Sequence, residues 1–147
     1  SRAGNELNQQ FPEIVEELRS LKDNYKDKLP IILDAELCIL DSEIKANFSS
    51  IQKRGRTKTS VTIDKLVTKS PASLCVFDLL EYNQVFYKNK SYLERKNLLH
   101  NILTDFSSSK QLRYVPYFEE LTEIWGLIKS ADGEGIIASI SIILYII

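Results

Sequence analysis

Ile31-Ile32-Leu33-Asp34-Ala35-Glu36-Leu37-Cys38-Ile39-Leu40-Asp41 is an apolar stretch that carries two carboxylates two residues apart. Because side chains alternate along a strand, Asp34 and Glu36 are expected on one face and the aliphatic side chains between them on the other. Two like charges on one face of a buried strand need a cation, a donor-rich ligand or water. The stretch therefore predicts a strand with one core face and one functional face, although a structural salt bridge is an alternative for Glu36.

The composition sets the class of protein and narrows the choice of partner. With 147 residues, 44% hydrophobic and 27% charged, the chain is typical of one globular domain. Its formal net charge of -1 gives no global signal for nucleic acid, so such a partner needs a local patch. The segment from Lys45 to Lys69 has seven basic residues and one acid, Asp64. It could contact a DNA backbone or form a solvated basic surface.

Both cysteines and both ends of the chain give further expectations. Cys38 and Cys75 lack zinc-site spacing, which favours buried reduced thiols in an intracellular protein, in cytoplasm or nucleoid. The polar start, Ser1 to Asn5, predicts no signal peptide, and the absence of methionine suggests a trimmed or excised segment. From Ile136 to Ile147, ten of twelve residues are apolar, which is below the roughly 17 that a membrane span needs. A buried strand is the first expectation for this tail.

Strand and helix patterns are mixed without regular alternation, which indicates an α+β fold. In the helix that Ser91 is expected to cap, Leu93, Leu98 and Leu99 begin the apolar stripe, and Glu94 to Lys96 are expected on the solvent side. The type of a short element at 64–67 stays open. The expected helices cover 11–21, 48–54, 91–103 and 118–128, and the expected strands cover 31–41, 74–80, 112–115 and the tail from 136.

Seven short segments occur in an order that resembles the nucleotidyltransferase (adenylation) domain of ATP-dependent DNA ligases. Each segment alone is weak evidence, but seven in the family's order are strong. The resemblance implies antiparallel sheets flanked by helices and covers nearly the whole chain, 1–147, as a partial adenylation domain. The segments are Ser1–Asn5, Phe11–Ile14, Leu33–Leu37, Ile51–Arg54, Val76–Leu80, Leu93–Lys96 and Asp132–Ala138.

Ligases of this family seal nicks in double-stranded DNA through lysyl-AMP and DNA-adenylate intermediates. The resemblance therefore implies ATP and Mg²⁺ as cofactors, nicked duplex DNA as the partner of the parent enzyme, no membrane, and a monomer. A divalent metal neutralises phosphate charge in such a reaction, and the lysine must be unprotonated to attack.

The resemblance also assigns roles to residues. Arg2 is similar to the phosphate-binding arginine that follows the nucleophile motif, and Phe77 to the ring that stacks on adenine. Glu36 and Glu134 are similar to the carboxylates of the ribose and metal environment, so both are candidate metal ligands. Phe77 considered alone would be a core aromatic, and Asp78 is expected to be structural. The candidate nucleic-acid contacts are Lys53, Arg54, Arg56 and Lys58.

The sequence departs from the family pattern at several motifs. Lysine-x-aspartate-glycine, the nucleophile motif, should precede Arg2 and is absent, and Lys129 has one residue too many before Asp132-Gly133. Ser139 stands where a lysine usually follows, and the final lysine motif and the OB-fold domain are missing downstream. We therefore expect no catalytic residue and no activity from this chain alone. A catalytically dead nucleotide- or DNA-binding remnant is the alternative, and an RNA ligase or capping-type nucleotidyltransferase fits less well.

Overall fold

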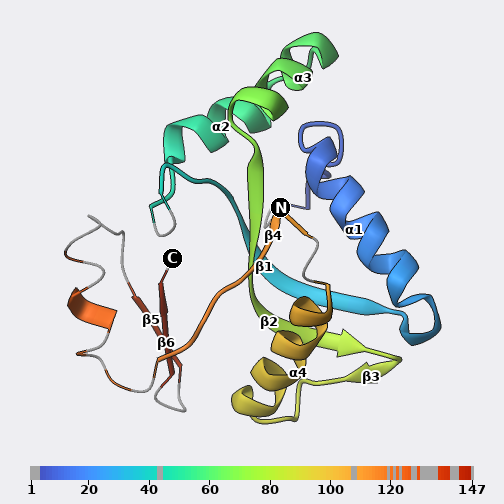
Figure 1. Cartoon of the computed structure of the whole chain (residues 1–147), viewed down its shortest axis with the longest axis vertical. Helices are drawn as coiled ribbons and strands as arrows, with labels where there is room; N and C mark the ends of the chain where they lie inside the picture. Colours follow the sequence, from blue (N-terminus) through green and yellow to red (C-terminus); the bar gives the residue numbers. More distant parts are fainter. Residues whose placement is uncertain are drawn as a thin grey trace.

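The computed structural model describes residues 4–42, 45–106, 109–118, 120, 122, 124–126, 129, 136–139 and 143–146, the last two ranges as backbone only. Figure 1 shows long, curved strands with helices packed against them and a small strand pair at one side. Among the described residues, no helix is long and apolar enough to cross a membrane.

The main sheet is built on two long antiparallel strands. β1 (Ile31–Ile39) pairs with β2 (Ala72–Tyr82), and two register shifts interrupt the ladder, between Ile32 and Leu33 and between Asp34 and Ala35. β3 (Val85–Phe86) pairs antiparallel with the end of β2, while β4 (Leu112–Tyr114) pairs parallel with its first half. Positive φ angles at Asn83 and Gln84 form the tight turn between β2 and β3.

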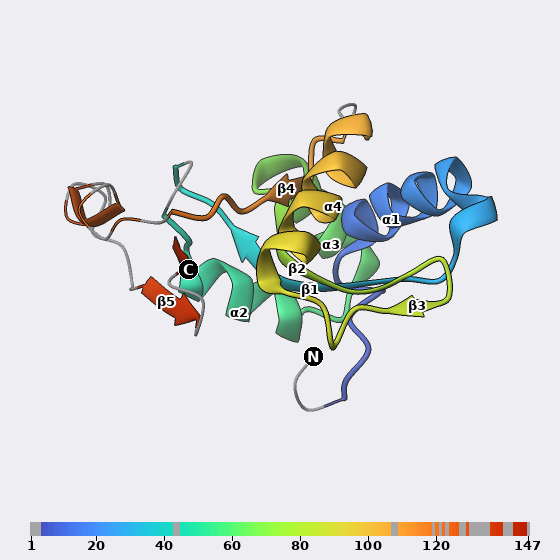
Figure 2. The same cartoon turned by 90° about the horizontal axis from the view of Figure 1, so that it is seen from below.

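Two helices cover one face of this sheet (Figure 2). α1 (Pro12–Asn24) begins with a proline in its first turn, and α4 (Tyr92–Asp105) begins with a capping box formed by Ser91 and Glu94. Their apolar sides meet β2 in the main core, against which the start of β1 also packs, and the 3₁₀ turn η1 (Lys26–Lys28) connects α1 to β1. The buried core residues are Leu21, Val76, Leu79, Leu99, Ile102, Leu103, Phe106 and Leu112.

A second, smaller cluster lies where the sheet meets the start of α1 and the helix that follows β1. α2 (Phe48–Arg56) and α3 (Ser60–Lys69) follow β1 and lead into β2 at one end of the molecule. Asn47 caps α2 by accepting a hydrogen bond from the Ser50 amide at 2.9 Å. The buried residues of this cluster are Phe11, Ile14, Ile39 and Ala72.

Most of the expected elements are present, and two expectations need correction. The element at 64–67, whose type was open, belongs to the helix α3. The tail contains two strands and not one, because β5 (Ile136–Ser139) pairs antiparallel with β6 (Ile143–Ile146). The stripe of α4 runs through Tyr92, Lys96 and Leu99, so Lys96 is buried and Leu93 is exposed. Much of the expected helix 118–128 lies outside the described residues.

Candidate functional site

Glu36 and Phe77 lie on the sheet face that points away from α1 and α4. Glu36 is exposed and pairs across the sheet with Cys75, so these two side chains share a face. Phe77 is two residues further along β2 and follows Val76, which is fully buried in the core on the other face. Phe77 falls at the register shift between Asp34 and Ala35 and has no partner on β1. Because Val76 fills the core side next to it, we assign the half-buried Phe77 to the Glu36 side. We call this surface, with Glu36, Cys38, Cys75 and Phe77, the open face.

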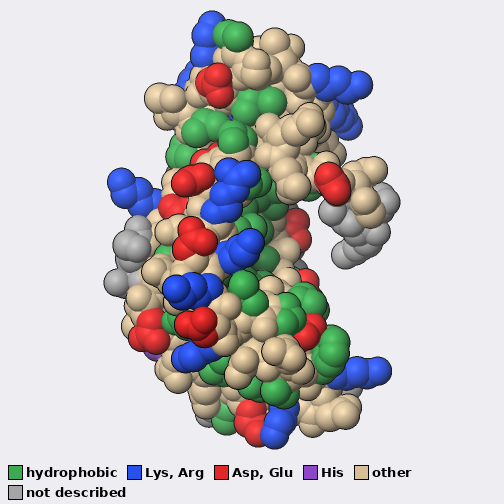
Figure 3. Space-filling model, turned by 90° about the vertical axis from the view of Figure 1, so that its right-hand side faces the viewer, with side chains coloured by type: hydrophobic (Ala, Val, Ile, Leu, Met, Phe, Trp, Pro, Cys, Tyr) green, Lys and Arg blue, Asp and Glu red, His purple; other side chains and the backbone are tan. Residues whose placement is uncertain are grey.

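Figure 3 shows that the molecule is hollowed along one side, with acidic and hydrophobic side chains on the wall of the hollow. Asp34 and Glu36 are both exposed, as alternation along β1 predicted, while Leu33 and Ala35 pack against the core. The two-faced strand expected from the sequence is therefore present.

Asp78 holds the strand next to Phe77 in place. Its carboxylate accepts two hydrogen bonds from the Arg95 guanidinium, at 2.8 Å from Nε and 2.7 Å from an Nη atom. The hydrogen bond to Asp78 is the main cause that raises the pKa of Arg95. Asp78 thus has the structural role expected from its position, and Arg95 is its partner.

Lys96 is a buried cation that the sequence reading missed. Its Nζ donates hydrogen bonds to the carbonyl oxygens of Phe77 and Val115, and it lies 4.2 Å from the centroid of the Tyr114 ring. Burial lowers the pKa of Lys96 to about 8, which the charge of Asp78 partly opposes. Lys96 therefore ties the backbone of β2 at Phe77 to the segment that follows β4. Lys96 is four residues after Tyr92 and three before Leu99, and this helical spacing was the signal in the sequence that it lies on the buried face.

The exposed carboxylates of β1 are of the chemical type that binds magnesium. Asp34 and Glu36 offer the hard oxygen ligands that Mg²⁺ prefers, and nucleotide phosphates commonly supply the rest. Across the described part of the chain, no group of three or more His, Cys, Asp or Glu side chains could hold a metal ion. Arg2 and Glu134 lie outside the described residues, so their positions relative to Glu36 are not part of this geometry.

The basic segment contains one residue that cannot serve as expected. Arg54 is 1% exposed and forms an ion pair with Glu13 at 2.9 Å, so we remove it from the candidate DNA contacts. Its Nε also donates to the Gln10 carbonyl at 2.6 Å, which joins α2 to the start of α1. Lys53, Arg56 and Lys58 are exposed. Figure 3 shows basic side chains at the end of the molecule formed by α2 and α3.

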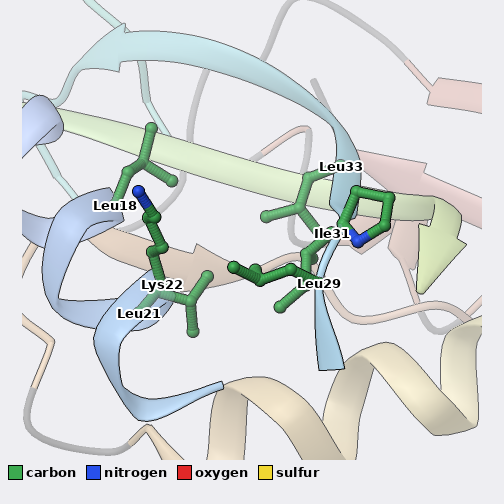
Figure 4. A pocket seen from close by; sticks show the side chains of 7 residues that line it. Leu18, Leu21, Lys22, Leu29, Ile31 and Leu33 are labelled. Atoms are coloured by element: carbon green, nitrogen blue, oxygen red, sulfur yellow. The ribbon is translucent and has the colours of Figure 1, made fainter. Parts of the chain in front are cut away.

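Figure 4 shows an apolar cavity of about 380 Å³. Leu33, which lines it, and Glu36 point to opposite faces of β1 by alternation. The cavity opens between α1 and the start of β1, and Lys22 is its one charged lining residue. It does not contain Glu36 or Phe77. The residues that line it are Leu18, Leu21, Lys22, Leu29, Pro30, Ile31 and Leu33.

Residues 1–145 match the family model of the ATP dependent DNA ligase domain, and the chain belongs to this family. It is 30% identical over 146 residues to the bifunctional non-homologous end joining protein LigD of Bacillus subtilis. That alignment covers 94% of this chain and 24% of LigD. A DNA ligase of Saccharolobus islandicus is 25% identical over 138 residues, which cover 92% of this chain and 22% of that ligase.

The fold is also similar to that of a solved ligase structure, mycobacterial DNA ligase D complexed with ATP and MES. The TM-score is 0.51 at 25% identity, and the match covers 78% of this chain and 31% of that chain. The chain thus spans about a quarter of the length of its curated relatives. The mixed sheet-and-helix fold expected from the motifs, and the family itself, are confirmed.

Proposed function

We propose that this chain supplies the nucleotide-binding sheet of an ATP-dependent DNA ligase that seals nicks through lysyl-AMP and DNA-adenylate. The observation that carries the proposal is the open face. It brings a carboxylate, Glu36, and an aromatic ring, Phe77, to one side of the sheet, away from the helices that cover the other side.

Each side chain has a role that its chemistry allows. Phe77 stacks on the adenine ring, since a half-buried aromatic side chain offers a flat apolar surface to a base. Glu36 contacts the ribose or the magnesium environment, for which an exposed carboxylate is suited. By their motifs, Arg2 binds a phosphate and Glu134 is the second metal-site carboxylate. Bound ATP supplies the phosphate that this family transfers, with Mg²⁺ balancing its charge.

We further propose that the 147-residue chain does not adenylate itself. Its sequence contains no lysine-x-aspartate-glycine, and Lys129 is followed by Ser130-Ala131 before Asp132-Gly133. Loss of one member of a catalytic unit removes most of its rate. Mass spectrometry after incubation with ATP and magnesium is expected to show the unmodified chain. A stable AMP adduct on any lysine would contradict this part of the proposal.

The nucleotide site is tested by titrating a fluorescent ATP analogue with magnesium into matched variants. Phe77→Ala is expected to weaken binding about thirtyfold, the middle of the range for base stacking on an aromatic ring. Phe86→Ala is the control, because Phe86 is 71% exposed on β3, away from the open face. Equal affinities of the two variants would remove Phe77 from the site.

The carboxylate has its own pair of variants. Glu36→Gln is expected to weaken binding in magnesium and to have a smaller effect in EDTA, because it removes a metal-compatible charge. The control is Glu16→Gln on α1, whose side chain is 78% exposed in a surface ion pair with Arg19. The same loss with and without magnesium would exclude the metal role of Glu36.

A second candidate function is binding of duplex DNA through the segment from α2 to α3. Lys53, Arg56 and Lys58 are exposed there, as are Lys65 and Lys69. Contacts of lysine and arginine with phosphates need no base recognition, so this segment suits sequence-independent binding. The alternative of a remnant that only binds nucleotide predicts no affinity for nicked duplex.

A further inference from the structure

The two cysteines of the chain lie at neighbouring positions on the open face. Cys75 pairs with Glu36 and Cys38 pairs with Ser73, so the two cysteines occupy diagonal positions on β1 and β2. Neither cysteine is in a disulfide, and each is half-buried. They are therefore reduced, as expected from the sequence, but half-buried and so within reach of small solutes.

Two neighbours control the reactivity of Cys75. The hydrogen bond from Cys38 lowers the pKa of Cys75, and Arg113, which pairs with Cys75 on β4, adds to this effect. Burial and the Glu36 charge act in the opposite direction, and the net pKa is lowered. The thiolate is the nucleophile in thiol chemistry, and the disulfide that results is the same whichever cysteine reacts first.

We propose that Cys38 and Cys75 form a redox-sensitive modification site that closes to a disulfide and weakens nucleotide binding on the open face, an inference that rests on the proposed function. The oxidant is a hydroperoxide. The Cys75 thiolate attacks one peroxide oxygen, the O–O bond breaks, and Cys75 becomes a sulfenic acid as hydroxide leaves. Cys38 then attacks the Cys75 sulfur and displaces water. Both thiols are oxidised, and the peroxide is reduced to water.

The geometry makes this disulfide easy to reverse. Diagonal cross-strand positions are separated by about 7–8 Å between Cα atoms, whereas disulfides span about 4.4–6.8 Å. Closing the bond must therefore draw β1 and β2 together locally and strain the bond. Strained disulfides are more readily reduced and are found at labile, regulatory positions.

The same strand movement explains why nucleotide binding responds. Glu36 is the cross-strand partner of Cys75, and Phe77 lies two residues from it on β2. A shift of β1 against β2 changes the position of Glu36 relative to Phe77. We expect the disulfide to lower affinity for an ATP analogue by about tenfold, within the usual range for coupled sites.

The test uses the whole chain, reduced and then treated with stoichiometric hydrogen peroxide. Mass spectrometry is expected to show the loss of two hydrogen atoms and, after digestion without reductant, a peptide joined through Cys38 and Cys75. Affinity for the fluorescent ATP analogue is measured on the reduced, oxidised and dithiothreitol-treated protein. Cys38→Ser and Cys75→Ser serve as controls that cannot form the bond, and their affinity is expected not to respond to peroxide in this way.

The outcomes separate this proposal from the proposed function. Formation of the joined peptide with a reversible loss of affinity supports the redox site. Absence of the joined peptide, or its formation with unchanged affinity, overturns it. If the reduced protein binds no nucleotide at all, the proposed function fails and the regulatory half of this proposal fails with it. The mass measurement then shows whether Cys38 and Cys75 form a disulfide.

Discussion

Arg95 of α4 donates two hydrogen bonds, at 2.8 and 2.7 Å, to the carboxylate of Asp78, which follows Phe77 on β2. Both side chains are largely buried, 18% and 14% exposed. This two-pronged geometry is the strongest form of an arginine–carboxylate pair. The pair fixes the segment of β2 that carries Phe77 against the helix behind it.

Asp78→Asn is expected to lower the free energy of unfolding by about 2 kcal/mol, because it leaves the Arg95 charge without its partner in a poorly solvated place. Urea denaturation measures this loss. Arg19→Met is the control, since Arg19 belongs to an ion pair that is more than two-thirds exposed on both sides. A loss no larger than in the control would show that the Asp78–Arg95 pair adds nothing.

Arg54→Met is expected to lower the free energy of unfolding by about 3 kcal/mol, because the Glu13 carboxylate then stays buried without its cation. Glu13 also accepts a hydrogen bond from the Ala72 amide at 3.0 Å, so the pair connects α1, α2 and β2. Arg56→Met is the matched control on the exposed side of α2. Similar stability of the two variants would contradict the structural role given to Arg54.

Stability is expected to depend on pH through Lys96. Its pKa is about 8 in the folded state and near 10.5 when unperturbed, so between these values the unfolded chain binds more protons. Stability therefore rises with pH above about 8, by about 1–2 kcal/mol up to pH 10. Below pH 8 both states are protonated, and Lys96 contributes no slope.

Urea unfolding of the wild type and Lys96→Met at pH 7, 8.5 and 10 measures this effect. The variant is expected to lose the rise. The measurements stay at or below pH 10 because Tyr114 affects stability above that pH. Burial raises the pKa of Tyr114 to about 12, so above pH 10 this tyrosine ionises first in the unfolded chain, and the free energy of unfolding falls as pH rises. If the free energies of unfolding of the two proteins changed with pH in parallel, the role given to Lys96 as a buried cation would be contradicted.

The affinity for nicked duplex DNA is expected to fall as the salt concentration rises. The triple variant Lys53→Gln, Arg56→Gln, Lys58→Gln is expected to reduce the slope of log affinity against log salt. Each lost phosphate contact lowers the slope of log affinity against log salt by about 0.9. The control is the triple variant Lys22→Gln, Lys26→Gln, Lys28→Gln, which removes three charges near the other end of the sheet. Equal slopes in both variants would indicate a diffuse charge effect without a defined DNA face.

Local patterns in the sequence predicted the parts of the structure that depend on neighbouring residues. Alternation gave the two faces of β1, and the capping residue Ser91 gave the start of α4. The partner of Arg54 is Glu13, 41 residues away, and no local pattern reports such a contact. Lys96 was wrongly predicted to be exposed, because its charged neighbours suggested the solvent side of the helix. Its spacing from Tyr92 and Leu99 puts it on the buried face of α4.

The candidate site was predicted in part for the same reason. Alternation along β1 gives the direction of Glu36, whereas Phe77 falls at a register shift in the pairing of β1 with β2. The diagonal placement of Cys38 and Cys75 also depends on the register of that pairing, which the two shifts in the ladder alter. A strand pattern alone does not fix register in this way.

Photo-crosslinking with 8-azido-ATP and peptide mapping tests the central claim most directly, that the open face is where nucleotide binds. The account predicts that the label is found on peptides of β1 or β2 around Glu36 and Phe77, and that excess ATP competes it away. Label confined to the peptides that line the apolar cavity, from Leu18 to Pro30, would place the nucleotide on the wrong side of the sheet and contradict the account.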